Sequence, residues 1–152
     1  MKNLRVNLLI CLSCLAFGLI SVSCSDESRT SADGGVGSNG GGSLEIVDVE
    51  AEAAAKLVAD GAVAVLDVRT PEEFALGHIG SALNRNINDE GFAEAVKSLD
   101  PSKTYLVHCA MGAAGGRSRR ALDSLKAAGA NKVYHLNGGF VAWQQAGNPT
   151  EK

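Results

Sequence analysis

From Leu44 onward, the chain alternates between short strand-like apolar runs and longer helix-like stretches. Residues 62–68 (AVAVLDV) form an apolar run interrupted only by Asp67, which is typical of a strand buried on both faces of a sheet. Strands are predicted at residues 44–47, 62–68, 81–87, 104–108 and 132–136. Helices are predicted at residues 49–60, 71–76, 89–99, 117–128 and 138–146.

This order of elements predicts an α/β domain. Strands that alternate with helices favour a central parallel sheet of five strands, covered by helices on both faces. In such sheets, ligands bind beyond the carboxyl ends of the strands. Cys109 follows the predicted strand 104–108 directly, so this end of the sheet is the candidate site. Trp143, in the last predicted helix, is expected in the core.

The first 43 residues contain almost nothing that could pack into a core. A basic start is followed by Leu8–Ile20, a continuous apolar run of 13 residues. A helix that spans a bilayer needs about 20 apolar residues, so this run is too short. With the small residues Ser21 and Ser23 after it, the pattern predicts a secretory signal peptide over residues 1–23.

Cys24 follows Ser21-Val22-Ser23, which resembles the cleavage site of bacterial lipoproteins, where the cysteine is lipidated. This chain has serine where that signal usually has leucine, so cleavage without lipidation is the alternative. Residues 24–43 are rich in glycine and serine and predict a disordered tether. We expect a domain of residues 44–152, anchored by a lipid on Cys24 to a membrane of the bacterial cell envelope. It would lie outside the cytoplasm, and face the periplasm in a Gram-negative cell.

Charge and cysteine usage exclude several classes of protein. The formal net charge of −3 becomes −5 without Lys2 and Arg5, which leaves 12 basic against 17 acidic residues. An acidic chain with few aromatic residues does not suit nucleic-acid binding. Of the four cysteines, only Cys109 lies in the predicted domain, so no disulfide framework is available there. A lone thiol is either buried and inert or kept for its reactivity.

The segment that begins at Cys109 (CAMGAAGGRS) combines a thiol with features of an anion site. Its glycines permit positive φ angles, and successive amides that lead into a helix N-terminus form a concave anion site. A thiol that faces these amides and the Arg117 guanidinium favours its thiolate form. Cys109 is therefore the candidate nucleophile. The candidate substrate-binding residues are Arg117, with its paired donors, and the loop residues Ala110, Met111, Gly112, Ala113, Ala114, Gly115 and Gly116.

Three motifs, in this order along the chain, resemble those of single-domain rhodaneses. Residues 67–74 (DVRTPEEF) and 77–82 (GHIGSA) resemble the N-terminal signature, and residues 109–118 resemble the active-site loop. Residues 138–143 (GGFVAW) resemble the C-terminal signature. The resemblance extends over residues 44–149 and implies a rhodanese-like fold.

The resemblance also implies a sulfurtransferase. Cys109 would take sulfane sulfur from a donor such as thiosulfate or a persulfide, and would pass it from its own persulfide to a thiol or to cyanide. Backbone amides from Ala110 to Arg117 would surround the persulfide and the donor anion. The expected partners are a small sulfur-containing anion and a thiol acceptor. We expect a monomer that uses no cofactor.

The loop departs in length from the family pattern. Rhodaneses have four residues between the cysteine and the arginine, whereas residues 110–116 make seven here. Related phosphatases and arsenate reductases of the same fold lengthen this loop by one residue, to admit a tetrahedral oxyanion. The extra residues either bulge outward or widen the pocket. Oxyanion chemistry is therefore a second hypothesis, and a non-catalytic domain that binds an anion or a partner is a third.

Three other residues are candidates for supporting roles. Asp67 and Arg69 lie at the end of a predicted strand on the side of the site. There they either brace the loop through an ion pair or cap the following turn. Ser118 directly follows Arg117 in the loop motif.

The three histidines show no metal-ligand spacing with Cys109, so no metal is expected. His108 adjoins Cys109, but neighbouring strand residues point to opposite faces of a sheet, which argues against a direct role as a base. His78 is expected to be structural, and His135 stands alone.

Overall fold

The computed structural model describes residues 43–152. The signal peptide over residues 1–23, the lipidation of Cys24 and all of the tether except Ser43 lie outside the described residues, so they stay predictions. Within the described part of the chain, no helix has both the length and the apolar character needed to cross a membrane.

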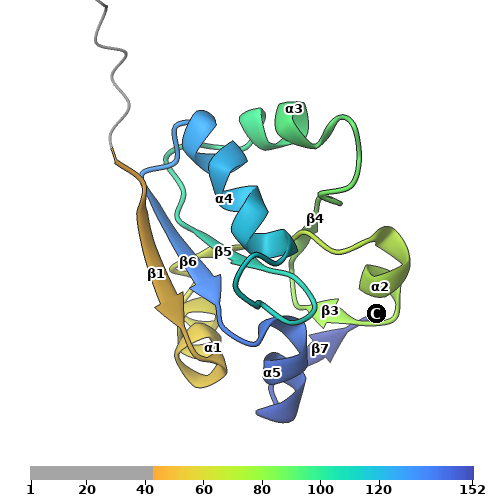
Figure 1. Ribbon diagram of the computed structural model, residues 1–152. Helices are drawn as coiled ribbons and strands as arrows, with labels where there is room; N and C mark the ends of the chain where they lie inside the picture. The colour runs from red at the N-terminus through yellow and green to blue at the C-terminus, as the bar shows by residue number, and fades with distance from the viewer. Residues whose placement is uncertain (1–42) are drawn as a thin grey trace, which may run out of the picture. The chain divides into compact units, whose positions relative to one another are not determined.

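A five-stranded parallel sheet forms the centre of the domain, which confirms the predicted fold class (Figure 1). Its strands are β1 (Glu45–Val49), β2 (Ala64–Asp67), β4 (Leu83–Asn84), β5 (Tyr105–His108) and β6 (Lys132–Leu136). They lie in the order β1-β6-β5-β2-β4, and all neighbours are parallel. Every residue of the central strand β5 is buried. The carboxyl end of this strand leads directly into Cys109.

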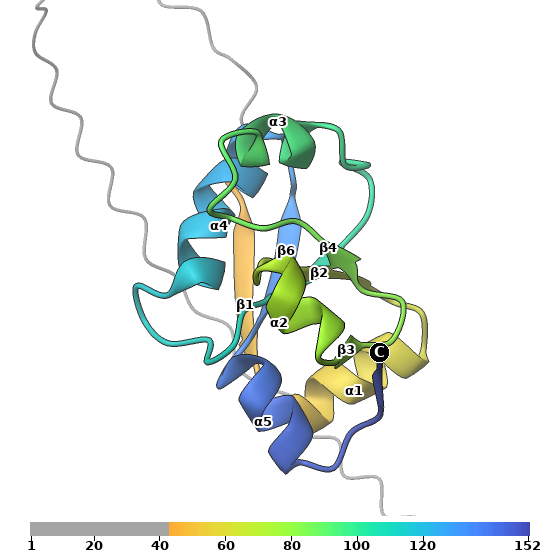
Figure 2. The same ribbon diagram turned by 90° about the vertical axis from the view of Figure 1, so that its right-hand side faces the viewer.

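Helices cover both faces of the sheet (Figure 2). On one face lie α3 (Phe92–Lys97) and α4 (Arg117–Ala127), and on the other α1 (Ala51–Ala59) and α5 (Gly139–Gln145). Each face of the sheet has its own hydrophobic core, and alternate residues of β5 point into one or the other. Val107 packs with α3 and α4 in the first core, and Leu106 packs with α1 and α5 in the second. Trp143 is 2 % exposed in the second core, as predicted.

The region between β2 and β5 differs from the prediction of one strand over residues 81–87. The helix predicted at residues 71–76 is present as α2 (Pro71–Ala75), but two short strands follow it in place of the single strand, β3 (His78–Ile79) and β4. Ser81, between these strands, has a φ of 59°, which interrupts an extended strand. β3 pairs antiparallel with β7 (Thr150–Glu151). Such a pairing of two-residue strands leaves no alternating pattern in the sequence, which is why it was not predicted.

A buried ion pair joins the end of β2 to α2 and α5. Asp67 is 0 % exposed and Arg69 is 4 % exposed. Nε and Nη2 of Arg69 donate to Oδ2 of Asp67 at 2.9 and 2.6 Å, and Nη2 also donates to the carbonyl of Gly77 at 2.7 Å. The guanidinium lies 4.0 Å from the centre of the Phe140 ring. Both charges are thus compensated inside the protein, as buried charges must be.

Arg69→Gln should lower the free energy of unfolding by about 3 kcal/mol, because it leaves the buried carboxylate of Asp67 without its cation. Urea denaturation followed by circular dichroism measures the change. Arg120→Gln makes the same substitution at an exposed position of α4 and should change stability by less than about 0.5 kcal/mol. Equal losses in the two variants would contradict the role of the pair.

Candidate active site

Cys109 lies directly beyond the carboxyl end of β5 and is 4 % exposed. Its sulfur accepts a hydrogen bond from the backbone amide of Gly112 at 3.4 Å and one from the hydroxyl of Ser118 at 3.3 Å. Ser118 belongs to the first turn of α4, which begins at Arg117. The loop over residues 110–116 therefore bends back over the thiol and continues into the helix that covers it.

These contacts lower the pKa of the Cys109 thiol below its usual value. Burial acts in the opposite direction and is the largest single influence, because desolvation disfavours the thiolate. The hydrogen bonds from the Ser118 hydroxyl and from the amides of Ser118, Gly112 and Met111 together outweigh it. The N-terminus of α4 adds a partial positive charge on the same side. The site thus favours a nucleophilic thiolate.

The loop packs against the N-terminus of α5 so closely that two positions require glycine. Gly112 has a φ of 55°, and a Cβ atom there would lie 2.7 Å from the amide nitrogen of Gly139. Gly139 has a φ of 58°, and its Cβ atom would lie 2.5 Å from the carbonyl oxygen of Cys109. That same carbonyl accepts a hydrogen bond from the amide of Phe140 at 2.9 Å. Close backbone contact with the first residues of α5 therefore fixes the position of the first part of the loop, from Cys109 to Gly112.

The extra loop residues bulge outward. Ala113, Ala114 and Gly115 are all exposed, and the amide of Gly116 donates to the carbonyl of Ala113 at 2.9 Å, which closes a turn. Beneath this turn lies a cavity of about 250 Å³. Its lining consists of Cys109, Ala110, Met111, Ala113, Gly116 and Arg117. Of the two arrangements that the sequence leaves open, the structure has the outward one.

Arg117 lines this cavity, but its guanidinium already has an anionic partner. Nη1 and Nη2 donate to the two carboxylate oxygens of Glu73 in α2, the latter at 2.7 Å. These hydrogen bonds hold the pKa of Glu73 down at about 2, although partial burial opposes them. The paired donors that the sequence assigns to a substrate anion therefore bind Glu73. Glu73 itself was not predicted, because it precedes Arg117 by 44 positions and has the ordinary place of an acid in a helix first turn.

The three supporting residues occupy different places. Ser118 touches the sulfur of Cys109. Asp67 and Arg69 lie behind the site. Arg69 contacts the ring of Phe140, whose amide donates to the carbonyl of Cys109. It also donates to the carbonyl of Glu73, the partner of Arg117.

His135 does not stand alone, and that prediction is wrong. Its Nε2 lies 2.9 Å from the hydroxyl oxygen of Ser118, and its Nδ1 lies 2.8 Å from Oδ1 of Asp48. Asp48 and His135 face each other across the β1–β6 pairing, although 87 positions separate them in the sequence. Only the register of the strands brings them together. The predicted strand 44–47 also ends one residue before Asp48.

His108 packs on the opposite side of the sheet from the Cys109 sulfur. Its ring is stacked 6.1 Å from that of Phe140, and its Nε2 lies 3.6 Å from Oδ2 of Asp67. His78 stacks on Phe74 at 3.8 Å and contacts the Phe74 carbonyl through Nδ1, as a structural residue would. Within residues 43–152, no three His, Cys, Asp or Glu side chains are grouped to hold a metal ion.

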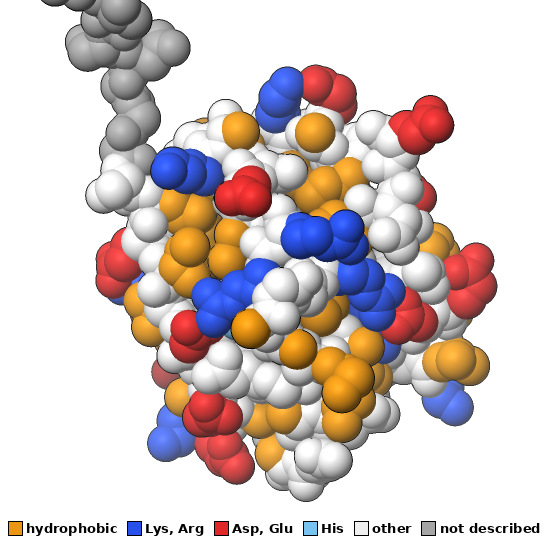
Figure 3. Space-filling model, viewed as in Figure 1, with side chains coloured by type: hydrophobic (Ala, Val, Ile, Leu, Met, Phe, Trp, Pro, Cys, Tyr) orange, Lys and Arg blue, Asp and Glu red, His pale blue; other side chains and the backbone are white. Residues whose placement is uncertain are grey.

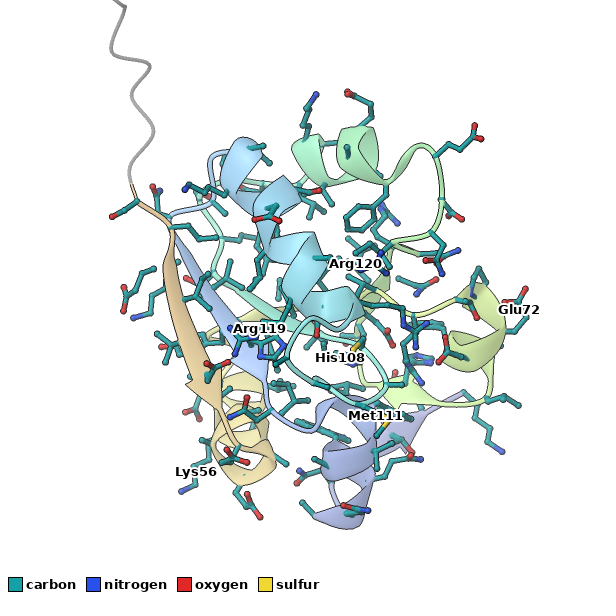
Figure 4. All side chains as sticks on the ribbon, viewed as in Figure 1. Lys56, Glu72, His108, Met111, Arg119 and Arg120 are labelled. Carbon is teal, nitrogen blue, oxygen red and sulfur yellow. The ribbon has the colours of Figure 1, made fainter. Side chains whose placement is uncertain are left out.

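Basic side chains surround the loop on the surface. Figure 3 shows Lys and Arg side chains gathered on this face. Figure 4 shows Arg119 and Arg120 extending from α4 to opposite sides of it, with Met111 beside α5. Met111 is 67 % exposed. An approaching anion therefore meets a positive rim before it reaches the cavity.

Comparison with known proteins agrees with this fold. The family model described as the rhodanese-like domain matches residues 50–146. The chain belongs to the rhodanese-like family. Thiosulfate sulfurtransferase 18 of Arabidopsis thaliana is 38 % identical over 111 residues, which cover 65 % of this chain and 79 % of that protein.

Other similar proteins differ in how much of their length the chain covers. An uncharacterized protein of Synechocystis is 37 % identical over 98 residues, which cover 60 % of this chain but only 48 % of that protein. The crystal structure of a rhodanese-related protein from Thermoplasma volcanium superposes with a TM-score of 0.60 at 31 % identity. That match covers 69 % of this chain and 97 % of the other.

Gly112→Ala should displace the loop, because its Cβ atom would collide with the backbone of α5. Gly115→Ala is the matched control, since Gly115 also has a positive φ, of 73°, but has open space around it. The control should cost about 1 kcal/mol of stability and leave Cys109 reactive. Gly112→Ala should cost more and slow alkylation of Cys109 by iodoacetamide. Equal alkylation rates in the two variants would show that the contact with α5 does not position the loop.

Glu73→Gln should make stability less dependent on pH in acid. The pKa of Glu73 in the folded protein is about 2, against 4.5 for a free side chain, so between these values the unfolded chain binds more protons. The stability that this carboxylate contributes is therefore present above about pH 4.5 and is lost as the pH falls toward 2. Urea denaturation should find the native protein more stable than the variant at neutral pH, and the two should converge in acid. A difference that stays constant with pH would point to packing rather than charge.

Proposed function

We propose that this protein is a sulfurtransferase that carries sulfane sulfur on Cys109 as a persulfide. The observation that carries the proposal is the geometry at the sulfur, which is held by the amide of Gly112 and the hydroxyl of Ser118 at the mouth of a small cavity. The donor is of the thiosulfate or persulfide type, and the acceptor is a thiol or cyanide. The similarity to a protein named as a thiosulfate sulfurtransferase supports this choice.

The reaction runs in two displacements, each with a thiolate as nucleophile or leaving group. The Cys109 thiolate attacks the outer sulfur of thiosulfate, a new S–S bond forms, and the old S–S bond breaks so that sulfite leaves with its electron pair. The outer sulfur of the persulfide then carries the negative charge inside the cavity. An acceptor thiolate attacks this sulfur, and Cys109 leaves as a thiolate. Neither step requires a separate oxidant or reductant.

One feature counts against the oxyanion hypothesis for this chain. Since the extra loop residues point outward, they do not enlarge the space around the sulfur. The pairing of Arg117 with Glu73 weakens the binding of any dianion, thiosulfate included, so it does not separate the two hypotheses. The pKa of Cys109, lowered by its hydrogen bonds against the effect of burial, favours a catalytic domain over one that only binds a partner.

Mass spectrometry of the intact protein after incubation with thiosulfate, or with glutathione persulfide, tests the proposal. We expect a mass gain of one sulfur that maps to the peptide containing Cys109 and disappears when cyanide is added. Cys109→Ser should show no gain and no thiocyanate production above background, because the nucleophile is absent.

No persulfide on Cys109 with either donor would contradict the proposal. Hydrolysis of an aryl phosphate that is lost in Cys109→Ser would support the oxyanion hypothesis in its place.

A further inference from the structure

A continuous chain of polar groups joins the sulfur of Cys109 to the surface. The sulfur lies 3.3 Å from Oγ of Ser118, and that oxygen lies 2.9 Å from Nε2 of His135. Nδ1 of His135 lies 2.8 Å from Oδ1 of Asp48, which also pairs with Arg119. Figure 4 shows Arg119 reaching from α4 toward β1. Ser118 and His135 are both 0 % exposed, so water does not replace these contacts.

The number of protons available allows two protonation states for this series of hydrogen-bonded groups. The hydroxyl of Ser118 has a single proton, which it can donate to the sulfur or to Nε2 of His135, but not to both. Asp48 is a carboxylate, because its hydrogen bond from Arg119 holds its pKa below the usual value. A carboxylate only accepts, so Nδ1 of His135 carries a proton in either state.

The state of the sulfur therefore determines the state of the imidazole. A Cys109 thiolate accepts the Ser118 proton, so the Ser118 oxygen must accept a proton from Nε2, and His135 is an imidazolium. A Cys109 thiol donates to Ser118, whose proton then points to Nε2 of a neutral His135. The two titrations are coupled through one hydroxyl group.

We propose that His135 accepts the proton of the Cys109 thiol through Ser118 and so prepares the thiolate for attack on the sulfur donor. The role of this thiolate rests on the proposed sulfurtransferase function. In the transfer, the S–H bond of Cys109 breaks and its proton binds Oγ of Ser118, while the original hydroxyl proton moves to Nε2 of His135. The transfer involves no oxidation or reduction, and the net charge of these hydrogen-bonded groups stays the same. His135 acts through Ser118 and is therefore a positioning residue.

The groups around His135 suit this exchange. Burial lowers its pKa and Arg119 lowers it further, while Asp48 opposes them, so the imidazole begins neutral and able to accept a proton. The charged groups that face it are Asp48 on β1 and Arg119 on α4, and the Cys109 sulfur lies beyond Ser118. His108 lies on the opposite side of the sheet. His108 stays uncharged because its complete burial lowers its pKa. The thiolate is thus the added negative charge that stabilises the imidazolium.

The test is the pH profile of Cys109 alkylation by iodoacetamide in the full chain, followed on the Cys109 peptide by mass spectrometry. His135→Gln keeps a hydrogen-bonding side chain beside Ser118 but cannot take up a proton. We expect its thiolate pKa to rise by at least about one unit, which makes alkylation near neutral pH about tenfold slower. Tyr134→Phe, at the next position of β6, should leave the profile unchanged. An unchanged profile in His135→Gln would overturn the proposal.

A double-mutant cycle tests whether His135 acts through the hydroxyl. Ser118→Ala should raise the thiolate pKa, and adding His135→Gln to it should raise the pKa no further, because the path between the two groups is already broken. Additive shifts would overturn the path through Ser118. Alkylation needs no sulfur donor, so these results stand even if Cys109 never forms a persulfide, and a failure here leaves the persulfide test intact.

Two further measurements do not depend on the folding of His135→Gln. Asp48→Asn changes a half-exposed side chain and should shift the alkylation profile upward by a smaller amount, because Nδ1–H loses its carboxylate. In the unaltered chain, ¹⁵N NMR of the His135 ring should show a higher pKa than in Cys109→Ser, which lacks the thiolate. The same His135 titration with and without the thiol would contradict the coupling.

Discussion

The sulfur of Cys109 is almost completely buried, and a negative charge in such a place is stable only if protein groups replace the lost water. Amides of the loop, the hydroxyl of Ser118 and the N-terminus of α4 supply these groups. All of them depend on the loop turning back over the thiol within contact distance of α5. The absence of side chains at Gly112 and Gly139 makes this approach possible, so the chemistry of the sulfur depends on two positions that carry no functional group.

One short segment after β2 organises the charges around this site. Asp67 and Arg69 form the buried pair, and Nη1 of Arg69 also donates to the carbonyl of Glu73 at 3.2 Å. That contact holds α2 where the carboxylate of Glu73 meets Arg117. The role of the motif at residues 67–74 is therefore to hold the carboxylate of Glu73 opposite Arg117 of the loop. This pairing limits how strongly Arg117 can bind a highly charged anion.

Two different groups of contacts contribute to the reactivity of the Cys109 thiol. The loop amides and the helix stabilise the thiolate once it exists, independently of any titrating side chain. The contacts from Ser118 through His135 to Asp48 supply a place for the proton. A buried histidine whose two ring nitrogens both have partners is held in one orientation, which gives the exchange a defined direction. The positive rim around the loop adds a longer-range attraction for anions.

Much of the fold and the centre of the site could be predicted, because both depend on neighbours in the sequence. The apolar runs of β2 and β5 reflect burial on both faces, and Cys109 follows β5 without a gap. The succession of strand, cysteine, glycine-rich loop and helix is contiguous, so its pattern indicates an anion site without knowledge of the rest of the fold. The two-residue strands β3 and β7 were beyond this reasoning, since pairing over 70 positions leaves no local signal.

The sequence by itself therefore determined the parallel α/β sheet and the position of the candidate nucleophile at the carboxyl end of one of its strands, whereas the strand order of the structure shows that this strand is the central one. Only the tertiary structure decided which partner each charged or polar side chain meets. Arg117 meets Glu73 because of how α2 packs, and His135 meets Asp48 because of the register between β1 and β6. The physical reason is that apolar patterning records whether a residue is buried, whereas hydrogen bonds depend on distances of a few ångströms between segments that are remote in the chain.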